Sequence, residues 1–171
     1  SALRTTPEGF AARADFPLRP SPFCKAAFVV REETFKPGRH PYHHAGVFYS
    51  QEPSASSAAP LLGVRPGMRV LDLCAAPGGK SLTIAEQMQD RGELFSGEAM
   101  TGRVKLLKQA FDRCGIERAK PYHGDATILN PAFGLGSFDR VLCDVPCSGL
   151  GVIGKKPDIR EKRWMGLKIY Y

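Results

Sequence analysis

Four side chains in the second half of the sequence have the types needed for ligand binding and catalysis. Glu98, Asp125 and Asp144 each follow a short apolar run, and Cys147 follows Asp144 by three residues. Such runs are expected to be strands, whose tips line the ligand crevice of an open parallel sheet. One acid at a strand end is ordinary, but recurrence after successive strands indicates a binding site. Cysteine attacks as the thiolate, so a catalytic Cys147 requires an electropositive, partly exposed setting.

The stretch at residues 69–81 would place these groups around a ligand. It reads RVLDLCAAPGGKS, which is an apolar run, a turn of small residues and the start of a helical pattern. A strand, loop and helix of this kind let a ligand lie against backbone N–H groups at the helix N-terminus. The stretch is not a phosphate-binding P-loop, because Cys74 replaces the first glycine of that motif. The glycine pattern at 149–154 is not followed by the apolar helix of a dinucleotide site.

The hydrophobic pattern predicts strands alternating with helices. Apolar runs indicate strands at residues 70–73, 93–97, 119–123 and 138–144. Helical spacing after the glycine loop is shown by Leu82, Ala85 and Met88. The clearest helix is 101–114, ended by Gly115, with a buried stripe of Val104, Leu107, Phe111 and Cys114. A short helix is expected at 54–62, with Ser54 as its cap. This alternation predicts an α/β fold with a parallel sheet.

Three further motifs accompany DLCAAPGGKS in the sequence. They are QEPSA at residues 51–55, Gly124-Asp125-Ala126, and Asp144-Val145-Pro146-Cys147-Ser148-Gly149. In this order, the four motifs resemble the Fmu/Sun family of RNA 5-methylcytosine methyltransferases, over about residues 42–160. QEPSA is most similar to the bacterial branch that modifies small-subunit ribosomal RNA. The resemblance implies a Rossmann-like, doubly wound methyltransferase sheet, of which this chain carries the first four strands.

The same resemblance implies two domains. Residues 1–50 would be part of a small α+β domain that binds RNA or connects to the catalytic one. Residues 51–171 would be a methyltransferase domain truncated at its C-terminal side. Within the first domain, residues 26–30 are expected to form a strand and residues 36–39 a turn. The cluster of His40, His43 and His44 lacks further metal ligands at suitable spacing, so a loop that packs or contacts RNA is preferred to a metal site.

The cofactor implied by the resemblance is S-adenosyl-L-methionine. Glu98 would accept hydrogen bonds from the ribose hydroxyls, since a carboxylate accepts two at once. Asp125 would accept from the adenine amino group, and Asp144 would lie beside the methionine end and the target base. The implied cofactor-binding residues are Cys74, Ala75, Ala76, Pro77, Gly78, Gly79, Lys80, Glu98, Arg103, Asp125 and Asp144.

The role of Cys147 depends on whether a second cysteine comes after it. Carbon five of cytosine is a poor nucleophile, so its methylation requires a thiolate to add at carbon six. In DNA cytosine methyltransferases the Pro-Cys thiol attacks. In the Fmu/Sun family a later Thr-Cys-Ser cysteine attacks, and the Pro-Cys thiol assists product release. This sequence has no Thr-Cys-Ser, and none of the 24 residues after Cys147 is cysteine. It also departs from the family pattern at residues 100–102 and at Gly154.

The missing motif leaves three interpretations. The chain is a fragment of a longer enzyme, a truncated product without turnover, or an enzyme in which Cys147 is the sole nucleophile. The fragment is preferred, because half of the expected sheet is also missing. The alternative function is a non-catalytic module that binds the cofactor or RNA. A basic run contacts RNA phosphates or is a solvated tail, and it consists of Lys155, Lys156, Arg160, Lys162 and Arg163.

Composition agrees with an RNA partner without proving it. The 171 residues include 24 Lys and Arg against 17 Asp and Glu, which gives a net charge of +7 that favours binding to nucleic acid. No apolar stretch is long enough to span a membrane. The five cysteines are odd in number and form no C-x-x-C pair, so we expect no disulfide framework, no zinc site and a reduced, cytoplasmic setting. The oligomeric state is left open.

Overall fold

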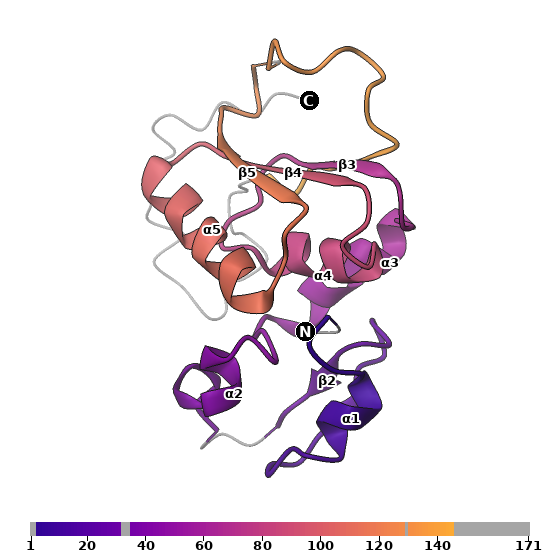
Figure 1. Cartoon of the computed structure of the whole chain (residues 1–171), viewed down its shortest axis with the longest axis vertical. Helices are drawn as coiled ribbons and strands as arrows, with labels where there is room; N and C mark the ends of the chain where they lie inside the picture. Colours follow the sequence, from indigo (N-terminus) through magenta and orange to yellow (C-terminus); the bar gives the residue numbers. More distant parts are fainter. Residues whose placement is uncertain (1–2, 32–34, 129, 146–171) are drawn as a thin grey trace, which may run out of the picture.

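The structure, a computed structural model, describes residues 3–31, 35–128 and 130–145. A small N-terminal part lies below a larger part that contains a sheet and its helices (Figure 1). The elements of the N-terminal part are α1 (Pro7–Ala11), β1 (Arg19–Pro20), β2 (Phe28–Val29), the 3-10 turn η1 (Pro37–Arg39) and α2 (Pro41–His44). β1 and β2 pair in antiparallel orientation. The strand expected at residues 26–30 is therefore present but shorter.

Aromatic side chains pack together inside the N-terminal part. Phe16 and Phe35 have ring centroids 4.2 Å apart, and Phe10 and Phe48 contact the same cluster. His40 joins the cluster with its ring 5.2 Å from that of Phe16. His40 also caps α2, because its Nδ1 accepts a hydrogen bond from the backbone N–H of Tyr42. The packing expected for the histidines is thus confirmed for His40. The expected loop is wrong for His43 and His44, because the capping imidazole and the proline after it start a helical turn.

A four-stranded parallel sheet organises the larger part, as the alternating pattern predicts. Its elements are η2 (Pro53–Ser57), α3 (Ala58–Leu62), β3 (Arg69–Asp72), α4 (Gly79–Gln87), β4 (Glu93–Glu98), α5 (Thr101–Cys114), β5 (Ala119–His123) and β6 (Arg140–Leu142). The strand order is β5-β4-β3-β6. All three pairings are parallel, so the carboxyl ends of the strands meet at one edge.

Helices α3, α4 and α5 lie on the face of the sheet that is turned toward the N-terminal part (Figure 1). Val70 and Leu94 point from the sheet into this layer, and Ile84 and Leu107 meet them from the helices, each at most 2% exposed. The stripe predicted on α5 is largely confirmed. Ala110 is buried beside Leu107, Phe111 and Cys114, while Val104 is only half-buried. Gly115 ends the helix in the left-handed region, at φ 74°.

The opposite face of the sheet is covered by the segment that leads from β5 to β6. Phe133 packs edge-on against Phe95 of β4 and against Phe138, with ring centroids 4.9 and 5.0 Å away. The guanidinium of Arg69 lies over both Phe95 and Phe138. Within the described residues, this smaller apolar layer is bordered by the Arg69 side chain, which is attracted to the faces of both rings.

The helical stretch before β3 differs from its prediction at its start. Glu52, not Ser54, is the cap, because its carboxylate accepts from the backbone N–H groups of Ser54 and Ala55. The hydroxyl of Ser54 donates to the same carboxylate instead of accepting from the helix. A 3-10 turn comes first and α3 follows. A carboxylate one residue before Pro53 reaches the free N–H groups, and its negative charge suits a helix N-terminus.

Two adjacent leucines on α5 test this arrangement of the core. Leu107 is fully buried, whereas Leu106 is 54% exposed. We expect Leu107→Ala to lower the free energy of unfolding by about 2–5 kcal/mol, because it leaves a cavity under the sheet. Leu106→Ala should change it by less than about 0.5 kcal/mol. Urea unfolding of both variants measures the difference, and equal losses would contradict the assigned core.

Candidate functional site

The small-residue loop, residues 74–79, lies at the carboxyl edge of the sheet between β3 and α4. The backbone N–H of Ala75 donates to the carbonyl of Gly97 on β4 at 2.8 Å, which fixes the loop against the neighbouring strand. Gly78 has φ 116°, a conformation that L side chains rarely adopt, and both it and Gly79 are buried. Gly78 is therefore required by backbone geometry at the point where the chain enters α4.

A buried polar network lies beneath the loop. Ser81 on α4 donates from Oγ to Oδ2 of Asp72 at 2.7 Å, and Ser96 on β4 lies 2.9 Å from the same hydroxyl. Because the proton of Ser81 is given to Asp72, Ser96 is the donor in the second contact. All three side chains are at most 1% exposed. Burial raises the pKa of Asp72 to about 6, against the opposing hydrogen bond from Ser81.

Glu98 and Arg103 hold the outer side of the loop. Glu98 is 5% exposed at the end of β4, and its Oε1 accepts from the backbone N–H of Met100 at 2.9 Å. Its Oε2 pairs with Nη1 of Arg103 at 3.2 Å. Nη2 of Arg103 donates to the carbonyl of Ala76 at 2.8 Å. The guanidinium thus joins the acid at the tip of β4 to the backbone of the loop.

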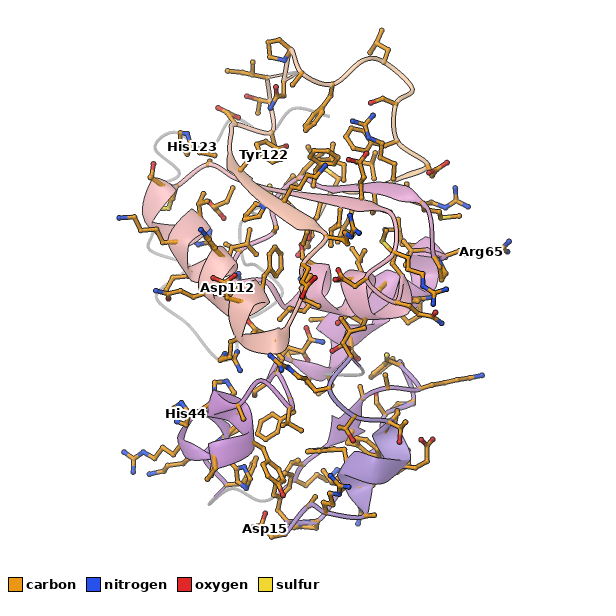
Figure 2. All side chains as sticks on the ribbon, in the orientation of Figure 1. Asp15, His44, Arg65, Asp112, Tyr122 and His123 are labelled. Atoms are coloured by element: carbon orange, nitrogen blue, oxygen red, sulfur yellow. The ribbon has the colours of Figure 1, made fainter. Side chains whose placement is uncertain are left out.

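The two other predicted site acids, Asp125 and Asp144, lie at the same edge of the sheet. Lys80, the second residue of α4, reaches Asp144 beyond β6, with Nζ 2.6 Å from Oδ2. Oδ1 of Asp125 accepts both the backbone N–H and the hydroxyl of Thr127, and these bonds lower the pKa of its carboxyl. His123, labelled in Figure 2 at the end of β5, contacts the carbonyl of Ala99 at 2.9 Å. The structure therefore places acids at the ends of three strands of one sheet. Arg103 joins Glu98 to the loop, and Lys80 joins Asp144 to the start of α4.

Of the two cysteines in the predicted site, only Cys74 lies within the described residues. Cys74 opens the small-residue loop and is half-buried, and burial raises the pKa of its thiol, with Cys143 the next contributor. A raised pKa keeps this thiol protonated near neutral pH, so Cys74 is a poor nucleophile. Cys147 and the basic run after it lie outside the described residues.

Several contacts at the loop have no counterpart in the sequence pattern. Ser81 and Ser96 are ordinary residues within a helix and a strand, and only their burial makes them partners of Asp72. Tyr49 and Gln51 approach the loop from the N-terminal part. The one available signal was the position of Gln51 in the QEPSA stretch.

The histidines do not form a metal site in the described part of the chain. His40 Nε2 lies 3.1 Å from Asp15, near the lower end of the molecule in Figure 2. Burial, followed by Arg113 and His44, lowers the pKa of His43. Within the described residues, no group of three or more potential metal ligands is found. In the same residues, no helix has the length and apolar character that crossing a bilayer requires.

A parallel sheet with strand order β5-β4-β3-β6, a small-residue loop after its central strand and acids at the neighbouring tips define a Rossmann-like methyltransferase. Residues 59–166 match the family described as 16S rRNA methyltransferase RsmB/F. The chain belongs to this family. Residues 1–53 match the N-terminal domain of 16S rRNA methyltransferase RsmF. The predicted resemblance and fold class are thus confirmed.

Individual relatives agree with the family match. The chain is 38% identical over 150 residues to ribosomal RNA small subunit methyltransferase F of Serratia proteamaculans, which is 84% of this chain and 31% of that protein. The corresponding protein of Erwinia tasmaniensis is 38% identical over 148 residues, 82% of this chain and 30% of that protein. The chain therefore spans about a third of the length of these curated relatives.

Solved structures show the same fold. The match to the crystal structure of PH0851 has a TM-score of 0.82 at 29% identity, and it spans 95% of this chain and 38% of the PH0851 chain. NSun6 from Pyrococcus horikoshii, solved with SFG, has a TM-score of 0.65 at 29% identity and covers 74% of this chain and 32% of its own.

The buried Asp72 makes stability depend on pH in a specific direction. A carboxyl whose pKa is raised by folding binds its proton more tightly in the folded chain. Its contribution to stability is complete below about pH 4 and is lost as the pH rises through about 6. Asp72→Asn, which keeps an acceptor for Ser81, should remove this loss. As the pH rises from 4 to 7, the free energy of unfolding of the variant should increase relative to that of the parent by up to about 3 kcal/mol. Urea unfolding across this range measures the gain, and parallel pH curves would contradict it.

Proposed function

We propose that this chain binds S-adenosylmethionine and serves the methylation of carbon five of a cytosine in ribosomal RNA. Family membership supports the reaction class and an RNA substrate. The observation that carries the cofactor assignment is the buried carboxylate of Glu98, held beside a glycine-rich loop at the carboxyl edge of a parallel sheet. In this proposal, residues 51–171 are the methyltransferase domain, and residues 1–50 belong to a domain that contacts RNA.

The residues present fit the cofactor. Glu98 uses one contact on each oxygen, and an ionised carboxylate has about four acceptor positions, so it can still receive a ribose diol. Asp125 accepts both of its described bonds on Oδ1, and Oδ2 is proposed to accept from the adenine amino group. The small side chains of the loop allow close approach to its backbone. S-adenosylmethionine supplies an electrophilic methyl group.

Asp144 and Cys147 are proposed to act on the base. Nζ of Lys80 lies 2.6 Å from Oδ2 of Asp144, and this ion pair fixes the direction of the carboxylate beside the loop. A thiolate adds to carbon six of cytosine, carbon five takes the methyl group, and loss of the carbon-five proton lets the thiolate leave. By family resemblance, the attacking thiol belongs to a Thr-Cys-Ser motif absent from this sequence, and Cys147 assists release.

The setting proposed for this activity is the cytoplasm. Within the described residues, Cys24, Cys74 and Cys143 are free thiols, as in proteins of reducing compartments. The excess of seven positive charges supports affinity for the phosphate backbone of RNA.

Glu98→Ala tests the cofactor assignment. Loss of a charged hydrogen-bond acceptor costs roughly 1.5–3 kcal/mol, so S-adenosylmethionine should bind roughly 10- to 150-fold more weakly. Glu117→Ala removes an exposed glutamate away from the loop and should leave affinity unchanged. Isothermal titration calorimetry measures both variants, and equal affinity of Glu98→Ala and the parent chain would refute the role.

The attacking thiol is tested with the 171-residue chain itself. Incubated with ribosomal RNA and S-adenosylmethionine, it should form no covalent protein–RNA adduct, because the proposed nucleophile is absent. A denaturing gel detects an adduct as a slowly migrating band. A band that disappears in Cys147→Ala would instead make Cys147 the nucleophile. A band that persists in that variant would assign the attack to another residue.

A further inference from the structure

The N-terminal strap, residues 45–51, runs from α2 to the start of the methyltransferase part and lies against two of its helices. Gly46 is buried with φ 68°, and a Cβ there would be 1.7 Å from the carbonyl oxygen of Arg113 near the end of α5. Arg113 donates to the carbonyl of His43, and its guanidinium lies 5.6 Å from the ring centroid of Tyr49. The strap is therefore fixed to α5 at one end by a backbone contact that admits no side chain.

At its other end the strap contacts the small-residue loop. The hydroxyl of Tyr49 donates to the carbonyl of Pro77 at 3.3 Å. Nε2 of Gln51 donates to Oγ1 of Thr83 at 3.2 Å, and Thr83 donates to the carbonyl of Gly79 at 2.9 Å. Two side chains of the strap thus reach the end of the loop and the first turn of α4.

Gly79 leaves no space between the loop and the strap. A Cβ on Gly79 would lie 2.4 Å from Oε1 of Gln51 and 3.1 Å from Cε1 of Tyr49. Oε1 of Gln51 is buried and has no hydrogen-bond partner among the described residues. Leaving an amide oxygen unsatisfied costs free energy, so the bond from Nε2 of Gln51 to Thr83 satisfies only part of this amide.

A cavity borders Gln51 on the side of the N-terminal part. It has a volume of about 300 Å³, and its walls include Phe48, Gln51, Gly79 and Thr83. Side chains next to a cavity have fewer packing partners on that side. The position of Gln51 therefore depends on its contacts with α4.

We infer that Tyr49 and Gln51 are positioning residues that set the shape of the small-residue loop for its cofactor, through contacts separate from that of Arg103. The inference rests on the proposed binding of S-adenosylmethionine. Neither side chain contacts the cofactor in this arrangement. Each acts through the backbone of Pro77, Gly79 or α4, so its removal should alter cofactor affinity without unfolding the chain.

The test combines single variants with a double-mutant cycle. Calorimetry with the 171-residue chain should give roughly three- to ten-fold weaker binding of S-adenosylmethionine for Gln51→Ala, and roughly two- to five-fold for Tyr49→Phe. Gln87→Ala, at the exposed end of α4, is the matched control and should bind as the parent does. Melting temperatures of Tyr49→Phe and Gln87→Ala should equal that of the parent.

Gly79→Ala distinguishes positioning from direct contact. If its new methyl group displaces Gln51, the double variant Gly79→Ala/Gln51→Ala should bind more tightly than Gly79→Ala alone, to within roughly threefold of Gln51→Ala. If the methyl group instead strikes the cofactor, the second substitution restores nothing, and the inference is overturned. Unchanged affinity in both Gln51→Ala and Tyr49→Phe overturns it as well.

Hydrogen exchange separates this inference from the proposed function. Without any cofactor, amides of residues 78–84 should exchange faster in Gln51→Ala and Tyr49→Phe than in the parent, while those of β4 should not change. If the parent fails to bind S-adenosylmethionine, the proposed function fails, yet faster exchange still supports positioning. Unchanged exchange in both variants rejects it.

Discussion

The contact between Asp72 and Ser81 connects the parts on which the site depends. Asp72 ends the central strand β3, Ser81 belongs to the first turn of α4, and Ser96 joins them from β4. A strand must leave the sheet and enter a helix here within six residues that have no regular hydrogen bonding. Because the three side chains are buried, water does not compete for their hydrogen bonds. The network fixes the start of α4 relative to β3, and the loop between them has few conformations left.

The loop itself is held from two directions by groups of different kinds. On its outer side, Arg103 joins the Ala76 carbonyl to the Glu98 carboxylate, an interaction in which charge provides both strength and direction. From the strap, Tyr49 and Gln51 supply neutral hydrogen bonds and steric contact. A positively charged ligand near the loop would thus interact with the carboxylate of Glu98. The hydrogen bonds of Tyr49 and Gln51 involve no charge and depend less on such a ligand.

Local patterns in the sequence predicted much of the fold and the broad position of the site. The spacing of Leu107, Phe111 and Cys114 identified α5, since helical periodicity is visible in neighbouring residues. Acids after successive apolar runs predicted their common position at one edge of the sheet, because parallel strands bring their ends together. Ser81 and Ser96 were not predicted, since serine at such positions is unremarkable until the fold buries it beside Asp72. The cap at Ser54 was predicted wrongly because the helical stretch starts two residues earlier, where the Glu52 carboxylate accepts from the N–H groups of Ser54 and Ala55.

The backbone contact of Gly46 with Arg113 has a consequence for how the molecule folds. The bond between Arg113 and the carbonyl of His43 joins residues 70 positions apart, and the surface that receives the strap exists only once α5 has formed. Contacts of such sequence separation require closure of a long loop, so they form late in folding. Docking of the strap therefore follows the formation of α5. Until then, the loop is held by the sheet and by Arg103, and the site reaches its full order when the strap docks.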